Sequence, residues 1–203
     1  IRWSQPVTKE KIEEARRGIW EVSLAGRAVP RSWFGDVSGR RILCLASGGG
    51  QQAPILAAAG AVVTSFDISD AQLTKDNLVA ERERLKIRIE RGSMTDLSRF
   101  DGESFDLIFL PVSLNAVPDV QPVWRECYRV VRRGGVLLVG FVNPTVFLFE
   151  ENDGSLPNRG LTVVHRLPYC EYESFSKDER RSAIERRSVF LWSHSLAALI
   201  GGQ

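Results

Sequence analysis

Three consecutive glycines, Gly48, Gly49 and Gly50, follow a short apolar run over residues 41–46 and precede a segment of helical character. Glycine lets a backbone pass close to a ligand, and the first turn of a helix has N–H groups that lack partners within the helix. A second apolar run, over residues 61–66, ends at Asp67. A carboxylate after the second strand can bind the two hydroxyl groups of a ribose. The spacing therefore predicts a site for a nucleotide-type cofactor.

The glycine loop also satisfies a narrower pattern. Gly48, Gly50 and Ala53 match GxGxxA, which dinucleotide-dependent dehydrogenases use around a pyrophosphate. This match favours an NAD(P)-dependent oxidoreductase as an alternative function.

The elements that would position these residues alternate between strands and helices. The sequence predicts an N-terminal helix over residues 8–20 and strands over residues 41–46, 61–66, 85–89, 105–112 and 136–142. Between the strands it predicts helices over residues 51–59, 69–83 and 119–131. The first, fourth and fifth strands are nearly continuous apolar runs, which is typical of strands buried on both faces. We therefore expect an α/β fold with a doubly wound, mostly parallel sheet and helices on both faces.

Right-handed crossovers would bring the carboxyl ends of these strands to one rim, where ligands bind at the point of strand-order reversal. Two local details follow from residue types. Ser69 and Gln72 predict a capping box at the start of the helix over residues 69–83. The doublet Gly134 and Gly135 is predicted to end the helix over residues 119–131.

Several segments resemble class I S-adenosylmethionine-dependent methyltransferases of the small bacterial type. RILCLASGGGQQAPILAAAG (residues 41–60) resembles the family's first motif, and RGSMTDLSRF (residues 91–100) resembles its Gly-Asp-Met-x-Asp-Leu segment. SFDLIFLPVSLNAVPDV and WRECYRVVRRGGVLLVGF resemble its fourth strand, following helix and fifth strand. The resemblance covers about residues 40–143 and implies a Rossmann-like methyltransferase fold.

The resemblance implies S-adenosyl-L-methionine as cofactor, S-adenosyl-L-homocysteine as product, and SN2 transfer of the methyl group to an acceptor. The glycine loop would pack on the methionine portion, Asp67 would hold the ribose, Asp96 would contact the adenine amino group, and Met94 would cover the adenine ring. The implied cofactor-binding residues are Ala46, Ser47, Gly48, Gly49, Gly50, Gln52, Asp67, Ile68, Gln72, Ser93, Met94, Thr95, Asp96, Leu110 and Val112.

The acceptor and any general base are not identified by the sequence. Trp33, Asn115 and Asn143 are candidates to face the acceptor. Trp33 also fits a core position, Asn115 a turn cap, and Asn143 the end of a strand. Asp67 and Asp96 also fit caps of turns.

The first motif departs from the family at two positions. Cys44 stands where the family usually has an acidic residue, and Ala46 stands where it has a glycine. A methyl group at Ala46 keeps the turn if its φ is negative. The missing acid leaves open a further alternative, a protein that binds the cofactor without catalysis.

Composition limits the classes of binding partner that the protein is expected to have. The 203 residues carry a net charge of +2, with 43% hydrophobic and 26% charged residues, so nucleic acid is not an expected partner. With the methyltransferase resemblance, a small-molecule acceptor is expected. The three cysteines have no CxxC spacing, and His165 and His194 have no partners at ligand spacing, so no metal is predicted. No apolar run reaches the roughly 20 residues of a membrane span, and the first residues lack a signal-peptide core. We therefore expect a cytoplasmic protein without a membrane partner.

We expect one domain over residues 1–203. It would comprise an N-terminal helix and cap (1–40), a cofactor-binding core (41–143), and a mobile loop with a C-terminal extension (144–203), with the mobile loop at residues 150–160. Closing strands usual in such sheets are expected to be missing from this sequence. The unpaired strand edge left behind could be covered by a second copy, giving a homodimer.

Overall fold

The structure is a computed structural model that describes residues 4–149, 161–186 and 188–203. The chain divides into two compact units. The first comprises Ile1–Ser113 and Pro122–Gly140, and the second comprises Leu114–Gln121 and Phe141–Gln203. The single domain expected from the sequence stays a prediction, and the two units are described separately below.

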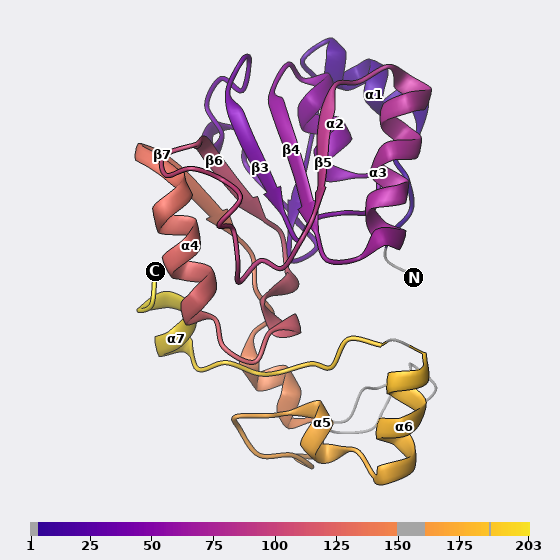
Figure 1. The fold of residues 1–203 in the computed structure, drawn as a ribbon, viewed down its shortest axis with the longest axis vertical. Helices are drawn as coiled ribbons and strands as arrows, with labels where there is room; N and C mark the ends of the chain where they lie inside the picture. Colours follow the sequence, from indigo (N-terminus) through magenta and orange to yellow (C-terminus); the bar gives the residue numbers. More distant parts are fainter. Residues whose placement is uncertain (1–3, 150–160, 187) are drawn as a thin grey trace. The chain divides into compact units, whose positions relative to one another are not determined.

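The first unit contains a five-stranded parallel sheet (Figure 1). Its strands are β3 (Arg41–Leu45), β4 (Val62–Asp67), β5 (Ile87–Arg91), β6 (Phe105–Leu110) and β7 (Val131–Val139), in the order β5-β4-β3-β6-β7. A separate two-stranded hairpin is formed by β1 (Ser23–Leu24) and β2 (Arg27–Ala28). The predicted α/β parallel sheet is therefore confirmed.

Apolar side chains explain why β3 and its neighbour β6 lie inside the sheet and not at an edge. Four of the five residues of β3 and five of the six residues of β6 are buried, as expected for strands covered on both faces. Phe34 and Phe109 pack against each other with ring centroids 5.7 Å apart, and Trp20 contacts Phe34 edge-on at 5.3 Å. The core thus supports β3 and β6.

The strand order reverses at β3, which pairs with β4 on one side and β6 on the other. The connecting helices are α2 (Gln52–Ala58), α3 (Asp70–Glu83) and α4 (Gln121–Val130). Because the chain winds outward from β3 in opposite directions, right-handed crossovers place α2 and α3 on one face and α4 on the other. All five strands point the same way in Figure 1, so their carboxyl ends share one rim.

The N-terminal helix is shorter than predicted. It is α1 (Lys9–Arg16), capped by the Thr8 hydroxyl, which accepts from the Lys11 N–H at 3.5 Å. The β1–β2 hairpin follows it, and then a 3-10 turn, η1 (Arg31–Trp33).

Two local predictions are wrong. The Ser69 side chain makes no capping hydrogen bond at α3, so the predicted capping box is not formed. Gly134 and Gly135 lie within β7 and do not end α4, which stops at Val130. Gly134 has φ +69°, and the pairing of β7 with β6 jumps there from Val131 to Val136. The glycines therefore build a bulge in the strand.

The second unit consists mainly of short helices. They are η2 (Ser113–Ala116), which begins at the boundary, η3 (Pro144–Leu148), α5 (Glu171–Ser174), α6 (Lys177–Glu185) and α7 (Leu196–Ile200). A capping box between Ser176 and Glu179 starts α6. The segment predicted to be mobile, residues 150–160, lies outside the described residues. Among the helices that the structure describes, none is long and apolar enough to cross a bilayer.

Candidate functional site

The loop after β3 begins with an alanine in the left-handed region. Ala46 has φ +46°, whereas the sequence analysis required a negative φ at this position. Its N–H donates to the Phe66 carbonyl at 2.7 Å, and its carbonyl accepts from the Ser113 hydroxyl at 2.8 Å. These two bonds hold a conformation that costs a residue with a Cβ about 1–2 kcal/mol. Strain of this kind often accompanies a functional turn.

Each glycine of the loop is required by its surroundings. Gly49 and Gly50 have φ values of +138° and +74°. A Cβ on Gly48 would lie 2.8 Å from the Cβ of Gln72 and 3.1 Å from Oδ2 of Asp67. The loop therefore passes close to the start of α3 and the end of β4, and its close approach to a ligand stays a prediction.

Asp67 fastens this loop to the end of β4. Its Oδ2 accepts from the Gly48 N–H at 3.0 Å and its Oδ1 from the Ser69 N–H at 2.9 Å. Burial raises the pKa of this carboxyl, and the backbone N–H groups oppose that rise. A carboxylate has about four acceptor positions, so both oxygens can accept further bonds from a ribose. Asp67 therefore caps the turn at Ser69 and contacts the glycine loop at the same time.

Asp76 is the residue that the sequence analysis missed. It is fully buried, its Oδ1 accepts from the Gly50 N–H at 2.7 Å, and its Oδ2 accepts from the Ser65 hydroxyl at 2.5 Å. Burial raises its pKa to about 6. A signal was present, because Asp76 shares the inward face of α3 with Leu73 and Val79 at helical spacing.

Two buried polar atoms beside the loop have no hydrogen-bond partner. They are Oγ of Ser47 and Oε1 of Gln72, and the latter lies 3.2 Å from the position a Cβ would take on Gly49. Buried polar groups are nearly always satisfied, and an exception calls for an explanation. A cofactor with polar groups at the loop would provide the partners, so these residues fit such a group.

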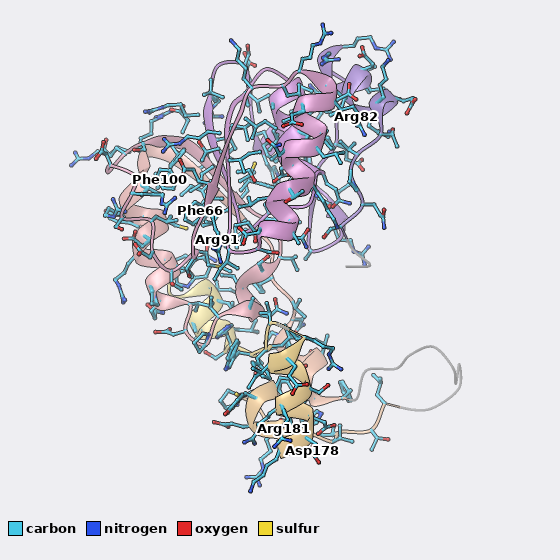
Figure 2. All side chains as sticks on the ribbon, turned by 45° about the vertical axis from the view of Figure 1, so that its right-hand side comes forward. Phe66, Arg82, Arg91, Phe100, Asp178 and Arg181 are labelled. Atoms are coloured by element: carbon cyan, nitrogen blue, oxygen red, sulfur yellow. The ribbon has the colours of Figure 1, made fainter. Side chains whose placement is uncertain are left out.

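The loop after β5 carries four of the predicted residues. Gly92 lies against Phe66, whose ring centroid is 5.5 Å from that of Phe100; Figure 2 labels both rings and Arg91 at the end of β5. The Ser93 and Thr95 hydroxyls lie 2.7 Å apart, and Met94 is buried.

Asp96 is exposed, and its Oδ1 accepts from the Ser98 N–H at 3.0 Å. Hydrogen bonds from Ser98 lower the pKa of this carboxyl. This is the geometry of a turn cap, and the contact with adenine stays a prediction.

The other predicted cofactor residues differ in exposure. The Gln52 amide exchanges hydrogen bonds with Ser23, its Nε2 donating to Oγ at 3.1 Å and its Oε1 accepting from the N–H at 3.2 Å. Gln52 therefore holds the β1–β2 hairpin beside the loop. Leu110 is fully buried at the end of β6, whereas Ile68 and Val112 are 59% and 38% exposed, which leaves their side chains available to a ligand.

The three predicted acceptor residues are divided between the two units, and their role toward an acceptor stays a prediction. Trp33 is 57% exposed and is therefore not a core residue. Its neighbour Phe34 accepts from Arg40, the residue before β3, so Trp33 lies near the amino ends of the strands. Asn115 and Asn143 belong to the second unit. Oδ1 of Asn143 accepts from the Thr145 N–H at 3.0 Å, which is the capping role considered for it.

Residues 4–7, the N-terminal segment, also contact the loop. The Val7 N–H donates to the Gly50 carbonyl at 2.7 Å. Lys75 Nζ donates to the Ser4 carbonyl at 2.6 Å, and Arg82, labelled in Figure 2, donates to the Val7 carbonyl at 2.6 Å. Two cations of α3 thus hold this segment in place, a role the sequence did not indicate.

A cavity of about 750 Å³ lies elsewhere, at the amino ends of the strands. Its lining includes Arg41, Val62, Ile87 and Phe105, which lie at or next to the first residues of β3, β4, β5 and β6. The glycine loop follows the opposite end of β3. Within the described ranges, no group of three or more His, Cys, Asp or Glu residues could hold a metal ion.

Comparison with known proteins identifies the family. A family model described as a methyltransferase domain matches residues 43–139. The uncharacterized methyltransferase YbaJ of Bacillus subtilis (strain 168) is 46% identical over 203 residues, which cover 99% of this chain and 78% of that protein. The ubiquinone biosynthesis O-methyltransferase of Alkalilimnicola ehrlichii is 32% identical over 118 residues, which cover 57% of this chain and 48% of that protein. The chain thus spans about half the length of this second relative.

A solved structure shares the fold. The S-adenosylmethionine-dependent methyltransferase from Mesorhizobium loti superimposes with a TM-score of 0.63 at 20% identity, covering 85% of this chain and 75% of that chain. The parallel sheet with its reversal at β3, the glycine loop and the extended match to YbaJ agree with one another. The chain belongs to the methyltransferase family that includes YbaJ.

Proposed function

We propose that this methyltransferase binds S-adenosylmethionine at the rim formed by the glycine loop, Asp67 and the loop after β5, and transfers its methyl group to a small-molecule acceptor. One observation carries the proposal. The unpartnered buried atoms of Ser47 and Gln72 lie at the loop that Asp67 fastens to β4. Polar atoms left unsatisfied at a glycine loop are what a polar ligand would complete.

Each part of the rim has a role in holding the cofactor. Residues 46–50 would present their backbone to the methionine portion, with Ser47 and Gln72 as hydrogen-bond partners. Asp67 would accept from the ribose hydroxyls with its remaining acceptor positions. Met94 would cover the adenine ring, and Asp96 would accept from the adenine amino group. Ile68, Leu110 and Val112 would supply apolar contacts.

When bound, S-adenosylmethionine would supply a methyl group activated by its sulfonium. An acceptor atom would attack the methyl carbon in line with the sulfur, which would leave as S-adenosylhomocysteine. The protein's contribution is alignment of the acceptor and exclusion of water. No residue is assigned as a general base. The apolar ends of β3 and β6 beside the loop, including Leu45 and Leu110, are fully buried. The residues beneath the rim are therefore packed side chains that exclude water.

The acceptor side of the proposal rests on the charge and on the relatives. A net charge of +2 does not favour nucleic acid, and several relatives are named ubiquinone biosynthesis O-methyltransferases, a name that points to small-molecule metabolism. Three free cysteines fit a reducing compartment such as the cytoplasm. The strand β7 is last in the sheet order, and a homodimer through this edge stays part of the proposal.

Isothermal titration calorimetry of the wild-type protein tests the cofactor. We expect saturable binding of S-adenosylmethionine and S-adenosylhomocysteine with one site per chain, and no heat change with NADH. Binding of NADH alone would instead support the oxidoreductase that the GxGxxA pattern suggested. A folded protein that binds neither would overturn the proposal.

A further inference from the structure

The central strand β3 lacks an acidic side chain beneath the glycine loop. Cys44 occupies the position where the family usually has one, and it is fully buried. Burial raises the pKa of its thiol, and the charge of Asp76 raises it further. Asp76, on the helix α3, is therefore an acidic side chain whose charge reaches the Cys44 position.

The Asp76 carboxylate is held in one place. Leu73 and Val79 anchor the same face of α3 in the core. The Ser65 hydroxyl on β4 donates to one carboxylate oxygen at 2.5 Å, and the Gly50 N–H donates to the other at 2.7 Å. The carboxylate thus links β4 and α3 to the third glycine of the loop, where the backbone has φ +74°.

Burying this charge is costly, and a neutral side chain of the same shape could occupy the position. A buried carboxylate without a cationic partner loses hydration that hydrogen bonds only partly replace. An asparagine could accept from Gly50 with its oxygen and donate to Ser65 with its nitrogen. A charge retained at such a cost suggests a role in function.

We propose that Asp76 is a positioning residue for cofactor binding. Its carboxylate, carried by α3, replaces the acidic side chain absent at Cys44 and fixes the Gly50 N–H so that residues 46–50 keep the shape that receives the methionine portion. The inference rests on the proposed function, because it assumes that the cofactor binds at this loop. Binding by the wild-type protein therefore tests the function, and the variants below test the inference.

The first experiment measures S-adenosylhomocysteine affinity by calorimetry for the wild type and Asp76→Asn. We expect the variant to bind about tenfold more weakly at pH 8, as loss of a charge-assisted hydrogen bond would cause. Asp70→Asn is the matched control, because Asp70 is an acid of the same helix whose side chain is 73% exposed. Equal affinities of Asp76→Asn and wild type, with a wild type that binds, would overturn the inference alone.

The pH dependence separates the charge from the shape of the side chain. The groups facing Asp76 are the Gly49 and Gly50 N–H groups, the Ser65 hydroxyl, the Cys44 thiol and the Asp67 carboxylate. The helix α2, which also packs on α3, has no charged residue. The charged residues of β5 form ion pairs among themselves and with other side chains: Arg88 with Glu90, Glu90 with Arg99, and Arg91 with Asp70.

Asp67 and the ligand titrate in the same way with the wild type and with Asp76→Asn. Their effects therefore largely cancel in the ratio of the dissociation constant of the variant to that of the wild type. We expect this ratio to fall toward one as the pH is lowered through about 6, where Asp76 becomes protonated in the wild type. A ratio that does not change with pH would mean that only the shape of the side chain matters, and would contradict the inference.

Moving the carboxylate provides the rescue test. Asp76→Ala removes the acid, and the double variant Cys44→Asp/Asp76→Ala places an acid on β3 instead. We expect the double variant to bind S-adenosylhomocysteine more tightly than Asp76→Ala. If both variants fold and bind equally weakly, an acid beneath the loop is not what the site requires. Should either fail to fold, Asp76→Asn and its pH profile decide the matter.

Discussion

Asp67 uses one acceptor position of each carboxylate oxygen for the Gly48 and Ser69 N–H groups. The remaining positions would bind the ribose. We predict that Asp67→Ala weakens S-adenosylmethionine binding by roughly 1–3 kcal/mol, the cost of leaving polar partners unmet. Calorimetry measures this loss. The variant Asp67→Asn distinguishes the ribose contact from the loop contact, because the asparagine side-chain oxygen can still accept from the Gly48 N–H. An unchanged dissociation constant in Asp67→Ala would remove Asp67 from the site.

Ala46 is the residue at which the loop carries backbone strain. Its φ of +46° costs about 1–2 kcal/mol, whereas glycine there would lose only roughly 0.5–1 kcal/mol more chain entropy. We predict that Ala46→Gly raises the free energy of unfolding by about 0.5–1 kcal/mol in urea denaturation. Ala57→Gly, in the helix α2, should do the opposite, since it removes a favourable helix residue. If Ala46→Gly instead lowered the free energy of unfolding, the backbone of Ala46 would not be strained in the protein in solution, which would contradict the prediction.

Residue types and spacing were enough to predict the glycine loop and Asp67, because both follow apolar runs that can only be strands. They did not predict the φ of Ala46, since the chain tolerates its strain only through the bonds to Phe66 and Ser113. Asp76 was missed because a lone acid on a helix suggests a solvated face, whereas packing against β4 buries it. Its spacing with Leu73 and Val79 pointed to an inward position, but its hydrogen bonds to Gly50 and Ser65 join segments that spacing alone does not bring together.

At the scale of elements, α3 carries a buried charge that opposes folding. Asp76 has a pKa of about 6 in the folded protein against 3.8 for the ordinary group, so the folded state binds this proton more tightly. The free energy of unfolding therefore falls as the pH rises from about 4 through 6, by about 3 kcal/mol for a shift of this size.

We predict that Asp76→Asn escapes this loss. The variant should match the wild type near pH 4 and exceed its unfolding free energy at pH 8, as measured by urea denaturation at both values. A parallel pH dependence of the two proteins would contradict the assignment. Greater stability combined with weaker cofactor binding would show that the carboxylate serves binding and not folding.

The end of β5 depends on Gly92. A Cβ there would lie far inside the contact distance of the Phe66 ring, and Phe66 packs on Phe100. We predict that Gly92→Ala displaces this ring, lowers the free energy of unfolding by roughly 1–3 kcal/mol, and weakens cofactor binding through the loop at residues 93–96. Gly102→Ala is the control, because a Cβ there would meet only the Arg129 carbonyl at 3.4 Å. Equal stability of the two variants would contradict the packing.

Most elements were predicted because their apolar runs and periodicity are strong. The start of β7 was not, since Val131 to Gly135 contains two arginines and two glycines and does not look like a strand. Its pairing with β6 instead comes from the bulge at Gly134. The capping box at Ser69 failed because the Gln72 side chain lies against the glycine loop, where its oxygen has no partner.

At the scale of the molecule, segments with a regular hydrophobic pattern lie mainly in the first unit, and segments without one lie mainly in the second. The first unit holds the sheet and all the predicted cofactor residues, and the family match falls on residues 43–139. The second unit contributes Asn115, Asn143 and short helices with little periodicity. The acceptor could not be predicted for this reason, because its pocket would depend on segments whose sequence follows no regular pattern.

The central claim is that three turns of the first unit bind one adenosyl ligand at the carboxyl rim of the sheet. A crystal structure of the protein with S-adenosylhomocysteine tests this most directly. We predict electron density with the ribose hydroxyls on Asp67, the homocysteine against residues 46–50 and the adenine beside Met94 and Asp96. Density at another surface, or a ligand that does not touch Asp67, would contradict the claim.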